Sequence, residues 1–155
     1  MHKIGILNVG SEGEQFTQRE LYNHFPASRI LRNVYLKKSN GDYTEIDLLA
    51  IDYCGIFVFE SKNFSGMIFG SQEDKDWTQV QRKNKRTFYN PIKQNTSHID
   101  ALKLNLKQYP QIQFYNFVVF SGTGKMKVNP ISLPNTYVVD LKELGNVIRD
   151  LRDAA

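Results

Sequence analysis

Residues 44–63 read TEIDLLAIDYCGIFVFESKN, and this stretch decides the fold. Two runs rich in Ile, Leu, Val and Phe flank the short segment 53–55, which ends in Gly55. Such residues favour strands, and so short a connection joins neighbouring antiparallel strands. The sequence therefore predicts a β-hairpin with strands over 44–52 and 56–62.

Three charged residues, Asp47, Glu60 and Lys62, interrupt this apolar hairpin. Side chains alternate faces along a strand, so Glu60 and Lys62 share one face with apolar neighbours. A two-residue loop at 53–54 places Asp47 opposite Glu60, whereas a loop at 54–55 or a four-residue loop places it opposite Lys62. Either register brings the three together, with facing Cβ atoms roughly 4.5 to 5.5 Å apart. Only an odd-numbered loop separates them.

Two carboxylates held this close on a mostly apolar face repel each other and are short of water. A divalent metal compensates directly, and hard oxygen ligands select Mg²⁺ or Mn²⁺. Lys62 beside them could hold or deprotonate an attacking water and offset phosphate charge. The same spacing also suits a plain Glu–Lys pair with an exposed Asp at a sheet edge.

Two further polar residues on expected helices could complete this cluster. A helix over 16–25 is predicted, with Ser11 as N-cap, and Glu14 falls on its inward stripe. Residues 11–14 also fit a capping box, in which Glu14 returns to the Ser11 backbone N–H. Gln94 lies in the first turn of a helix opened by Asn90-Pro91, where its amide could orient a phosphate or water or be solvated.

The remaining pattern completes an α/β fold with the order αβββαββα. Strands are expected over 29–38, 115–120 and 136–139, and a closing amphipathic helix is expected over 141–151. Residues 64–70 and 77–81 could form a small hairpin or an irregular arm. Because a helix links the meander to a later strand, a mixed central sheet flanked by helices is predicted.

The composition predicts one domain over residues 1–155. Twenty Lys or Arg residues against 16 Asp or Glu give a net charge of +4, and 41% of the residues are hydrophobic. The single cysteine, Cys54, excludes an internal disulfide and a multi-cysteine zinc site. With no long apolar run and no signal-peptide pattern, we expect a soluble cytoplasmic protein with no membrane partner.

Positive charge is concentrated between Gln79 and Lys93, a segment without acidic residues. A basic stretch with interleaved aromatics can follow a phosphate backbone and stack on bases. It can equally be a solvated loop anchored by its aromatic residues. The candidate nucleic-acid-binding residues are Arg82, Lys83, Lys85, Arg86, Lys93 and Trp77.

Taken together, these residues resemble the nuclease-related domain (NERD) family, a branch of the PD-(D/E)xK nuclease superfamily. The resemblance covers about residues 10–106. It rests on Gly10-x-x-Gly13-Glu14, Glu45-Ile46-Asp47, residues 55–63 followed by Gly66, Trp77, and residues 90–94.

The resemblance implies a restriction-endonuclease-like core and a role for each cluster residue. Glu14, Asp47 and Glu60 would bind Mg²⁺, Lys62 would assist catalysis, and Gln94 takes the position of a helix glutamine found in related nucleases. Ile46 stands where the superfamily name has Pro, which removes no ligand. Many such nucleases act as dimers, so a homodimer is possible.

The leading hypothesis is a Mg²⁺-dependent endonuclease or exonuclease that hydrolyses phosphodiester bonds, with DNA favoured over RNA. A non-catalytic nucleic-acid-binding or recruitment module with the same fold is the alternative. A plain structural or protein-interaction domain is the third. His98, one turn beyond Gln94, could edge the site or be an ordinary helix residue.

Overall fold

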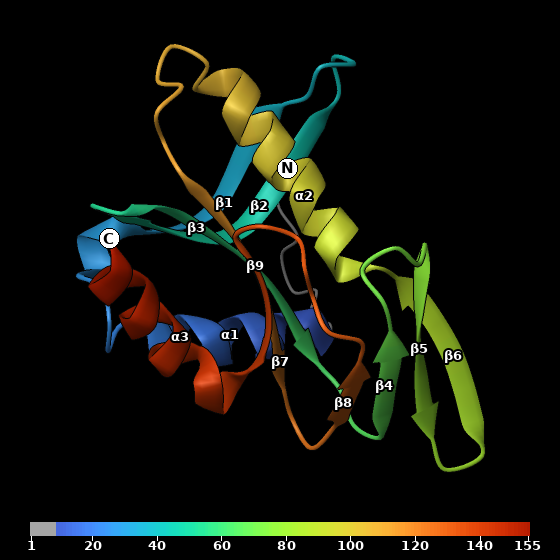
Figure 1. Ribbon diagram of the computed structural model, residues 1–155. Helices are drawn as coiled ribbons and strands as arrows, with labels where there is room; N and C mark the ends of the chain where they lie inside the picture. The colour runs from blue at the N-terminus through green and yellow to red at the C-terminus, as the bar shows by residue number, and fades with distance from the viewer. Residues whose placement is uncertain (1–8) are drawn as a thin grey trace.

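The computed structural model describes residues 9–155, with side chains from residue 12, as two mixed sheets and three α-helices (Figure 1). The first sheet has the order β1-β2-β3-β7-β9, and the second has the order β6-β5-β4-β8. The helices are α1 (Val9–Leu21), α2 (Pro91–Asn105) and α3 (Leu141–Ala154), with a short 3-10 turn at Ala27–Arg29. The strands of the first sheet are β1 (Ile30–Lys37), β2 (Tyr43–Asp52), β3 (Gly55–Asn63), β7 (Phe114–Ser121) and β9 (Thr136–Asp140).

The predicted hairpin forms the centre of the first sheet. β2 and β3 pair antiparallel, and Asp52 faces Gly55, so the loop consists of Tyr53 and Cys54. β3 then pairs with β7 in parallel, across the connection that contains α2, and β7 pairs in parallel with β9. The prediction of a mixed α/β fold with a central sheet flanked by helices is confirmed.

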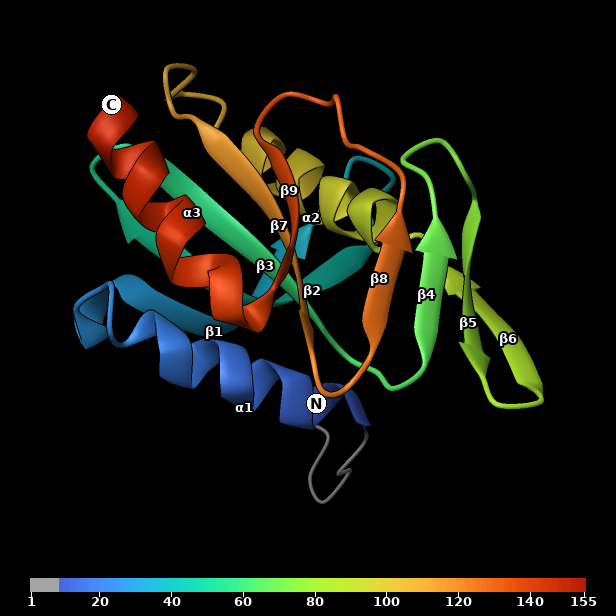
Figure 2. The same ribbon diagram turned by 60° about the horizontal axis from the view of Figure 1, so that its bottom comes forward.

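Helices cover both faces of this sheet, α1 and α3 on one and α2 on the other (Figure 2). On the α1–α3 face, Phe57, Phe59 and Phe117 are fully or almost fully buried, and their rings lie 5.4 to 6.4 Å apart. On the α2 face, Val58 packs with Ile99 and Leu102. The alternating strand β3 therefore contributes to two separate cores.

Two predicted helix starts have different outcomes. The first helix occupies Val9–Leu21 and not 16–25, so Ser11 lies within it and is not its N-cap. Phe25 belongs to the following turn, where its ring meets Phe57 edge-on at 5.4 Å. The start of α2 is as predicted: Asn90 Oδ1 accepts hydrogen bonds from the Ile92 and Lys93 N–H groups at 2.9 and 3.4 Å.

The second sheet was predicted only in part. Its strands are β4 (Met67–Gly70), β5 (Asp76–Gln81), β6 (Asn84–Tyr89) and β8 (Lys125–Val128). β4 and β5 pair antiparallel over the segments that the sequence left open as a hairpin or an arm. β6 and β8 were missed because one is polar and exposed and the other has only four residues, so neither carries an apolar strand pattern.

Trp77 joins the two sheets. Its indole is completely buried, stacks on Phe120 of β7 at 6.3 Å, and donates from Nε1 to the Ser71 carbonyl at 2.8 Å. Asn90 adds a second connection, because its Nδ2 donates to carbonyls of the β4–β5 loop, with the shortest bond, 2.8 Å, to Asp74. The start of α2 is thus fixed against the second sheet. None of the helices in the described range is both long and apolar enough to span a membrane.

The last turn of α3 clamps the turn of the β2–β3 hairpin. Arg152 Nε donates to Asp52 Oδ2 at 3.0 Å, and its guanidinium lies over the Phe25 ring at 4.4 Å. The Tyr53 hydroxyl donates to the Arg152 carbonyl at 3.2 Å. The Asp52 side chain is only 4% exposed, so Arg152 is its main source of compensation, with Arg29 Nη1 further away at 3.8 Å.

Replacing Arg152 with Met is expected to destabilise the protein by about 2 kcal/mol at pH 7, because a buried carboxylate loses its charged donor. Burial alone would raise the pKa of Asp52, but the hydrogen bonds and charge of Arg152 lower it below its ordinary value. A lowered folded pKa stabilises the protein above the unfolded pKa, and that contribution is lost as the pH falls through the folded pKa. The difference between variant and wild type should therefore shrink toward about pH 3.

Urea unfolding at both pH values measures this effect. Arg149→Met is the matched control, because Arg149 is exposed on the same helix and should change stability by less than about 0.5 kcal/mol. Equal destabilisation at neutral and acidic pH would show that Arg152 acts by packing on Phe25 alone.

Candidate active site

The hairpin register brings the predicted charged residues together where the pairing of β2 with β3 ends, near the middle of β2 and toward the end of β3. The paired register runs to Leu48 and Phe59, so Asp47 and Glu60 are the next facing residues beyond it. This is the register expected from a two-residue loop. Glu60 is 6% exposed, which is unusual for a carboxylate, and Asp47 is half-buried.

Lys62 is the charged partner of Glu60. Its Nζ lies 3.2 Å from Glu60 Oε2 and donates to Gln94 Oε1 at 3.4 Å. Burial raises the pKa of Glu60, the Lys62 charge and hydrogen bond oppose that rise, and the Asp47 charge adds to it, so the pKa lies above its ordinary value. Gln94, in the first turn of α2, therefore reaches the lysine of the cluster.

Glu14 approaches the cluster from α1. Its side chain is hydrogen-bonded to Asp47 and lies within electrostatic range of Glu60, so the hairpin acids have a helical neighbour. Gly13 permits this approach: a Cβ there would lie 3.3 Å from the Asn63 backbone nitrogen at the end of β3. The capping-box interpretation is wrong, because Ser11 is inside the helix and Glu14 bonds to Asp47.

Glu14 is largely protonated at neutral pH. Burial, the hydrogen bond to Asp47 and the negative charges of Asp47, Glu60 and Glu45 raise the pKa of Glu14 to about 8. The raised pKa has burial as its largest cause, and the neighbouring acids add to it. A proton shared with Asp47 relieves part of the repulsion.

Sequence reasoning missed a buried amide beneath the site. Asn95 is completely buried, and its Nδ2 donates to the Val58 carbonyl at 2.8 Å and to Asn116 Oδ1 at 2.9 Å. Its Oδ1 lies 3.2 Å from His98 Nδ1, and that nitrogen is 3.9 Å from Glu60 Oε1. Asn95 stands at an inward position between Ile92 and Ile99, so a polar residue on the apolar stripe of α2 was the available signal.

His98 edges the site as a buried histidine. It is 8% exposed, and burial lowers its pKa, with Lys38 and Lys62 adding to that effect and Asp47 opposing it. A neutral imidazole placed between Asn95 and Glu60 packs the base of the cluster.

The carboxylate donors fit a hard divalent cation in chemistry but are not gathered around one point. Glu14 and Asp47 bond to each other, while Glu60 is turned to Lys62. Over residues 9–155, no group of three or more His, Cys, Asp or Glu side chains is arranged to hold a metal ion.

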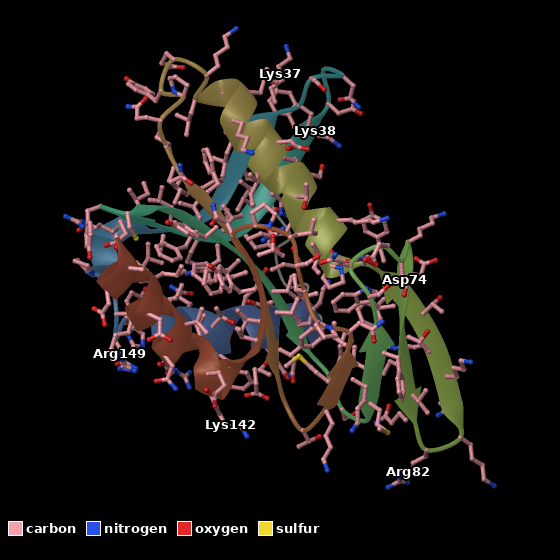
Figure 3. All side chains as sticks on the ribbon, viewed as in Figure 1. Lys37, Lys38, Asp74, Arg82, Lys142 and Arg149 are labelled. Carbon is pink, nitrogen blue, oxygen red and sulfur yellow. The ribbon has the colours of Figure 1, made fainter. Side chains whose placement is uncertain are left out.

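The basic residues lie on a different part of the molecule. Arg82, Lys83 and Lys85 are exposed at the far end of the β5–β6 hairpin, where Figure 3 labels Arg82. Arg86 is also exposed, but its Nε donates to Gln79 Oε1 and its guanidinium lies over the Phe64 ring at 5.5 Å. The basic segment is therefore part of a hairpin, and the three cations at its end have no ion-pair partner among residues 12–155.

Two of the predicted nucleic-acid residues are placed elsewhere. Trp77 is fully buried between the sheets, so the prediction that it stacks on bases is wrong. Lys93 lies on the first turn of α2, and its Nζ donates to the Glu73 carbonyl at 2.9 Å.

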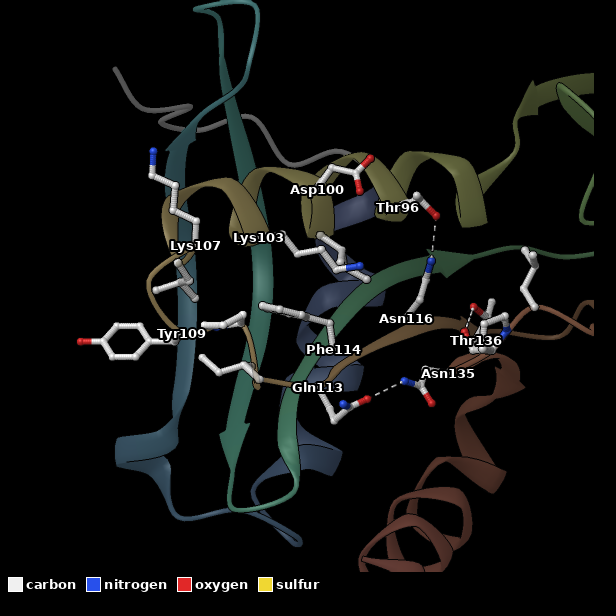
Figure 4. Close-up of a pocket in the computed structure, with 16 residues that line it drawn as sticks. Thr96, Asp100, Lys103, Lys107, Tyr109, Gln113, Phe114, Asn116, Asn135 and Thr136 are labelled. Carbon is white, nitrogen blue, oxygen red and sulfur yellow. Dashed lines mark hydrogen bonds between the residues drawn. The ribbon is translucent and has the colours of Figure 1, made fainter.

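Two cavities differ in their relation to this cluster. One of about 750 Å³ lies between the second half of α2 and the starts of β7 and β9, with Lys103, Phe114 and Asn135 in its wall, and none of the acids above lines it (Figure 4). A small one of about 80 Å³ lies among the acids. Its lining residues are Glu14, Gln15, Gln18, Arg32, Asp47 and Leu48.

Comparison with known proteins gives a family for this arrangement. A family model described as the nuclease-related domain matches residues 9–121, which include α1, the β2–β3 hairpin and α2. The chain is 32% identical over 145 residues to an uncharacterized protein of Bacillus anthracis, covering 93% of this chain and 68% of that protein. No solved structure matches the chain.

Replacing Glu14 with Gln is expected to stabilise the metal-free protein at alkaline pH. A carboxyl group with a raised folded pKa favours folding below its unfolded pKa of 4.5, and this contribution is lost as the pH rises through about 8. Measured in EDTA near pH 9, Glu14→Gln should be more stable by on the order of 1 kcal/mol, and near pH 4 the two proteins should be equal.

Chemical unfolding at both pH values checks this expectation. The control is Glu12→Gln, two residues earlier at an exposed position of α1, which should show no pH-dependent gain in stability. Equal stability of Glu14→Gln and wild type at pH 9 would contradict the shared-proton arrangement.

Proposed function

This chain belongs to the nuclease-related domain family, and we propose that it is a Mg²⁺-dependent nuclease that hydrolyses phosphodiester bonds in DNA. One observation carries the proposal: Glu14 of α1, Asp47 of β2 and Glu60 of β3 interact with one another, and Lys62 is held against Glu60. An acidic group beside a lysine is what metal-assisted phosphate chemistry needs. A purely structural ion pair would need neither Glu14 nor Asp47.

Glu14, Asp47 and Glu60 are the residues that would hold Mg²⁺ or Mn²⁺. All three donate through oxygen, and these ions prefer oxygen ligands. Bound Mg²⁺ would stabilise negative charge on the phosphate and lower the pKa of a water. Because metal ligation needs ionised carboxylates, metal binding would compete with the proton on Glu14 and with the pairing of Glu60 to Lys62.

Lys62 is the residue proposed to act on the reacting atoms. Its ammonium has three donors, of which Glu60 and Gln94 engage two, so one is left for a phosphate oxygen or a water. Gln94 and Glu60 fix the direction of Nζ, which makes them positioning groups for the lysine. His98 and Asn95 support Glu60 from below.

The β5–β6 hairpin is proposed as the arm that binds the nucleic-acid backbone. Its residues 81–87 are all exposed, and the side chains of Arg82, Lys83 and Lys85 have no ion-pair partner in the described part of the chain. A six-residue strand such as β6 extends about 20 Å, so the arm can contact phosphates several nucleotides from the acidic site. The preference for DNA over RNA follows the family resemblance.

Cleavage of plasmid and linear DNA is expected in Mg²⁺ and not in EDTA. Asp47→Ala removes a proposed metal ligand and Lys62→Ala removes the proposed catalytic lysine, so each should lower the cleavage rate by about 100-fold or more. Lys142→Ala and Asp153→Ala, at exposed positions on α3, are the charge-matched controls and should cut like wild type. Wild type that never cuts, or variants that cut equally well, would refute the enzymatic proposal.

Neutralising the arm is expected to weaken DNA binding and make it less sensitive to salt. In the triple variant Arg82→Gln, Lys83→Gln, Lys85→Gln, each lost phosphate contact should reduce the slope of log K against log salt by about 0.9. Fluorescence anisotropy with a labelled duplex measures the affinity and its salt slope. The control is the double variant Lys142→Gln, Arg149→Gln on α3. Arg152 is left unchanged in this control because it forms a structural ion pair with Asp52.

The same assay separates the enzyme from a non-catalytic binding module. Salt-sensitive binding through the arm without cleavage under any metal would favour the module. An unchanged slope in the triple variant would exclude the arm as the contact surface.

A further inference from the structure

Arg32 is the one cation that shares the small cavity with the candidate acids. It lies on β1, directly opposite Leu48 of β2, and the cavity of about 80 Å³ also has Glu14 and Asp47 in its wall. Nothing in the sequence marks this arginine, because it lies on a predicted strand without a motif.

The strand geometry explains why Arg32 reaches this cavity. Ile30 packs in the core beneath α1 and α3, and Arg32, two residues further, points to the same face. Asn33 has a left-handed φ of 54°, and after it Val34 packs on the opposite, α2 face. The strand therefore turns over immediately after Arg32, at the level of Asp47.

The positive charge of Arg32 is not balanced by an ion pair within the described residues. Its side chain is exposed and has no hydrogen bond or ion pair there, although the acids Glu14 and Asp47 line the same cavity. Glu14 and Asp47 bond to each other, and Lys62 engages Glu60. Because the guanidinium of Arg32 is not bonded to these acids, its planar set of N–H donors is available for an anion that presents two oxygens.

We propose that Arg32 binds a backbone phosphate of the nucleic acid, holding the strand at the α1 side of the acidic cluster. The inference rests on the proposed function, in which nucleic acid is the substrate. The acidic cluster alone would repel such a polyanion. A guanidinium at the opening offsets that repulsion and offers two parallel N–H donors to the non-bridging oxygens of one phosphate. Gln15 and Gln18 also line this cavity.

Equilibrium binding to a labelled DNA duplex in EDTA tests this contact without cleavage or metal. Arg32→Ala should weaken binding by about 5-fold to 10-fold and reduce the salt slope by about 1, as expected for one lost phosphate contact. Arg32→Lys should restore the slope but only part of the affinity, because an ammonium keeps the charge without the fork. Arg149→Ala, an exposed arginine on α3 that Figure 3 shows away from α2 and the second sheet, is the matched control.

The outcomes for Arg32 and for nuclease activity are separable. If Arg32→Ala binds with wild-type affinity and slope, the phosphate contact is refuted whether or not the protein cuts DNA. If wild type does not bind the duplex in EDTA, the contact is also refuted, while cleavage in Mg²⁺ still decides the enzymatic proposal. Arg32→Gln is a second variant, and a thermal melt of each variant checks that it is folded. A folded Arg32→Gln protein with an unchanged salt slope would also refute the phosphate contact.

Discussion

The two-residue turn of the β2–β3 hairpin is the constraint on which the rest of the structure depends. Gly55 has φ 146°, and a Cβ there would collide with the Gln113 carbonyl and the Tyr115 ring, so this position accepts only glycine. The turn fixes the register in which Asp47 faces Glu60. A slip of one residue would move every side chain of one strand to the other face and separate the acids. Arg152 holds the same turn from α3 through Asp52.

The sequence predicted those elements whose signals are local. The hairpin, the Asn90-Pro91 helix start and the buried strand β7 follow from alternation, capping chemistry and a continuous apolar run, and all three are present. The second sheet depends on pairing between β4 and β8, which are more than fifty residues apart and only four residues long. Pairing between such short, distant strands leaves almost no trace in either segment.

Side-chain roles were harder to predict than backbone positions. Glu14 fitted two interpretations because a capping box and an inward acid require the same residue, and only the position of the helix start decides between them. Trp77 looked available for bases because the sequence places it beside cations, whereas Gly70 leaves room for its ring within the core. Arg32 and Asn95 had no motif at all, since their importance comes from the elements that pack against them.

The charged side chains of this molecule differ in burial, and this distribution is more informative than the net charge. The net charge of +4 combines a half-buried acidic cluster with cations that lie at increasing exposure around it. Lys62 is partly buried and pairs with Glu60, Arg32 is exposed at the cavity beside Glu14 and Asp47, and residues 81–87 at the end of the β5–β6 hairpin are all exposed. Lys62 engages Glu60 but not Glu14, whose pKa is raised to about 8 by burial first and then by the hydrogen bond to Asp47 and the neighbouring negative charges. The same crowding of acids that helps to raise this pKa is what the proposed metal binding would use, so the electrostatics of the cluster and its proposed chemistry have the same origin.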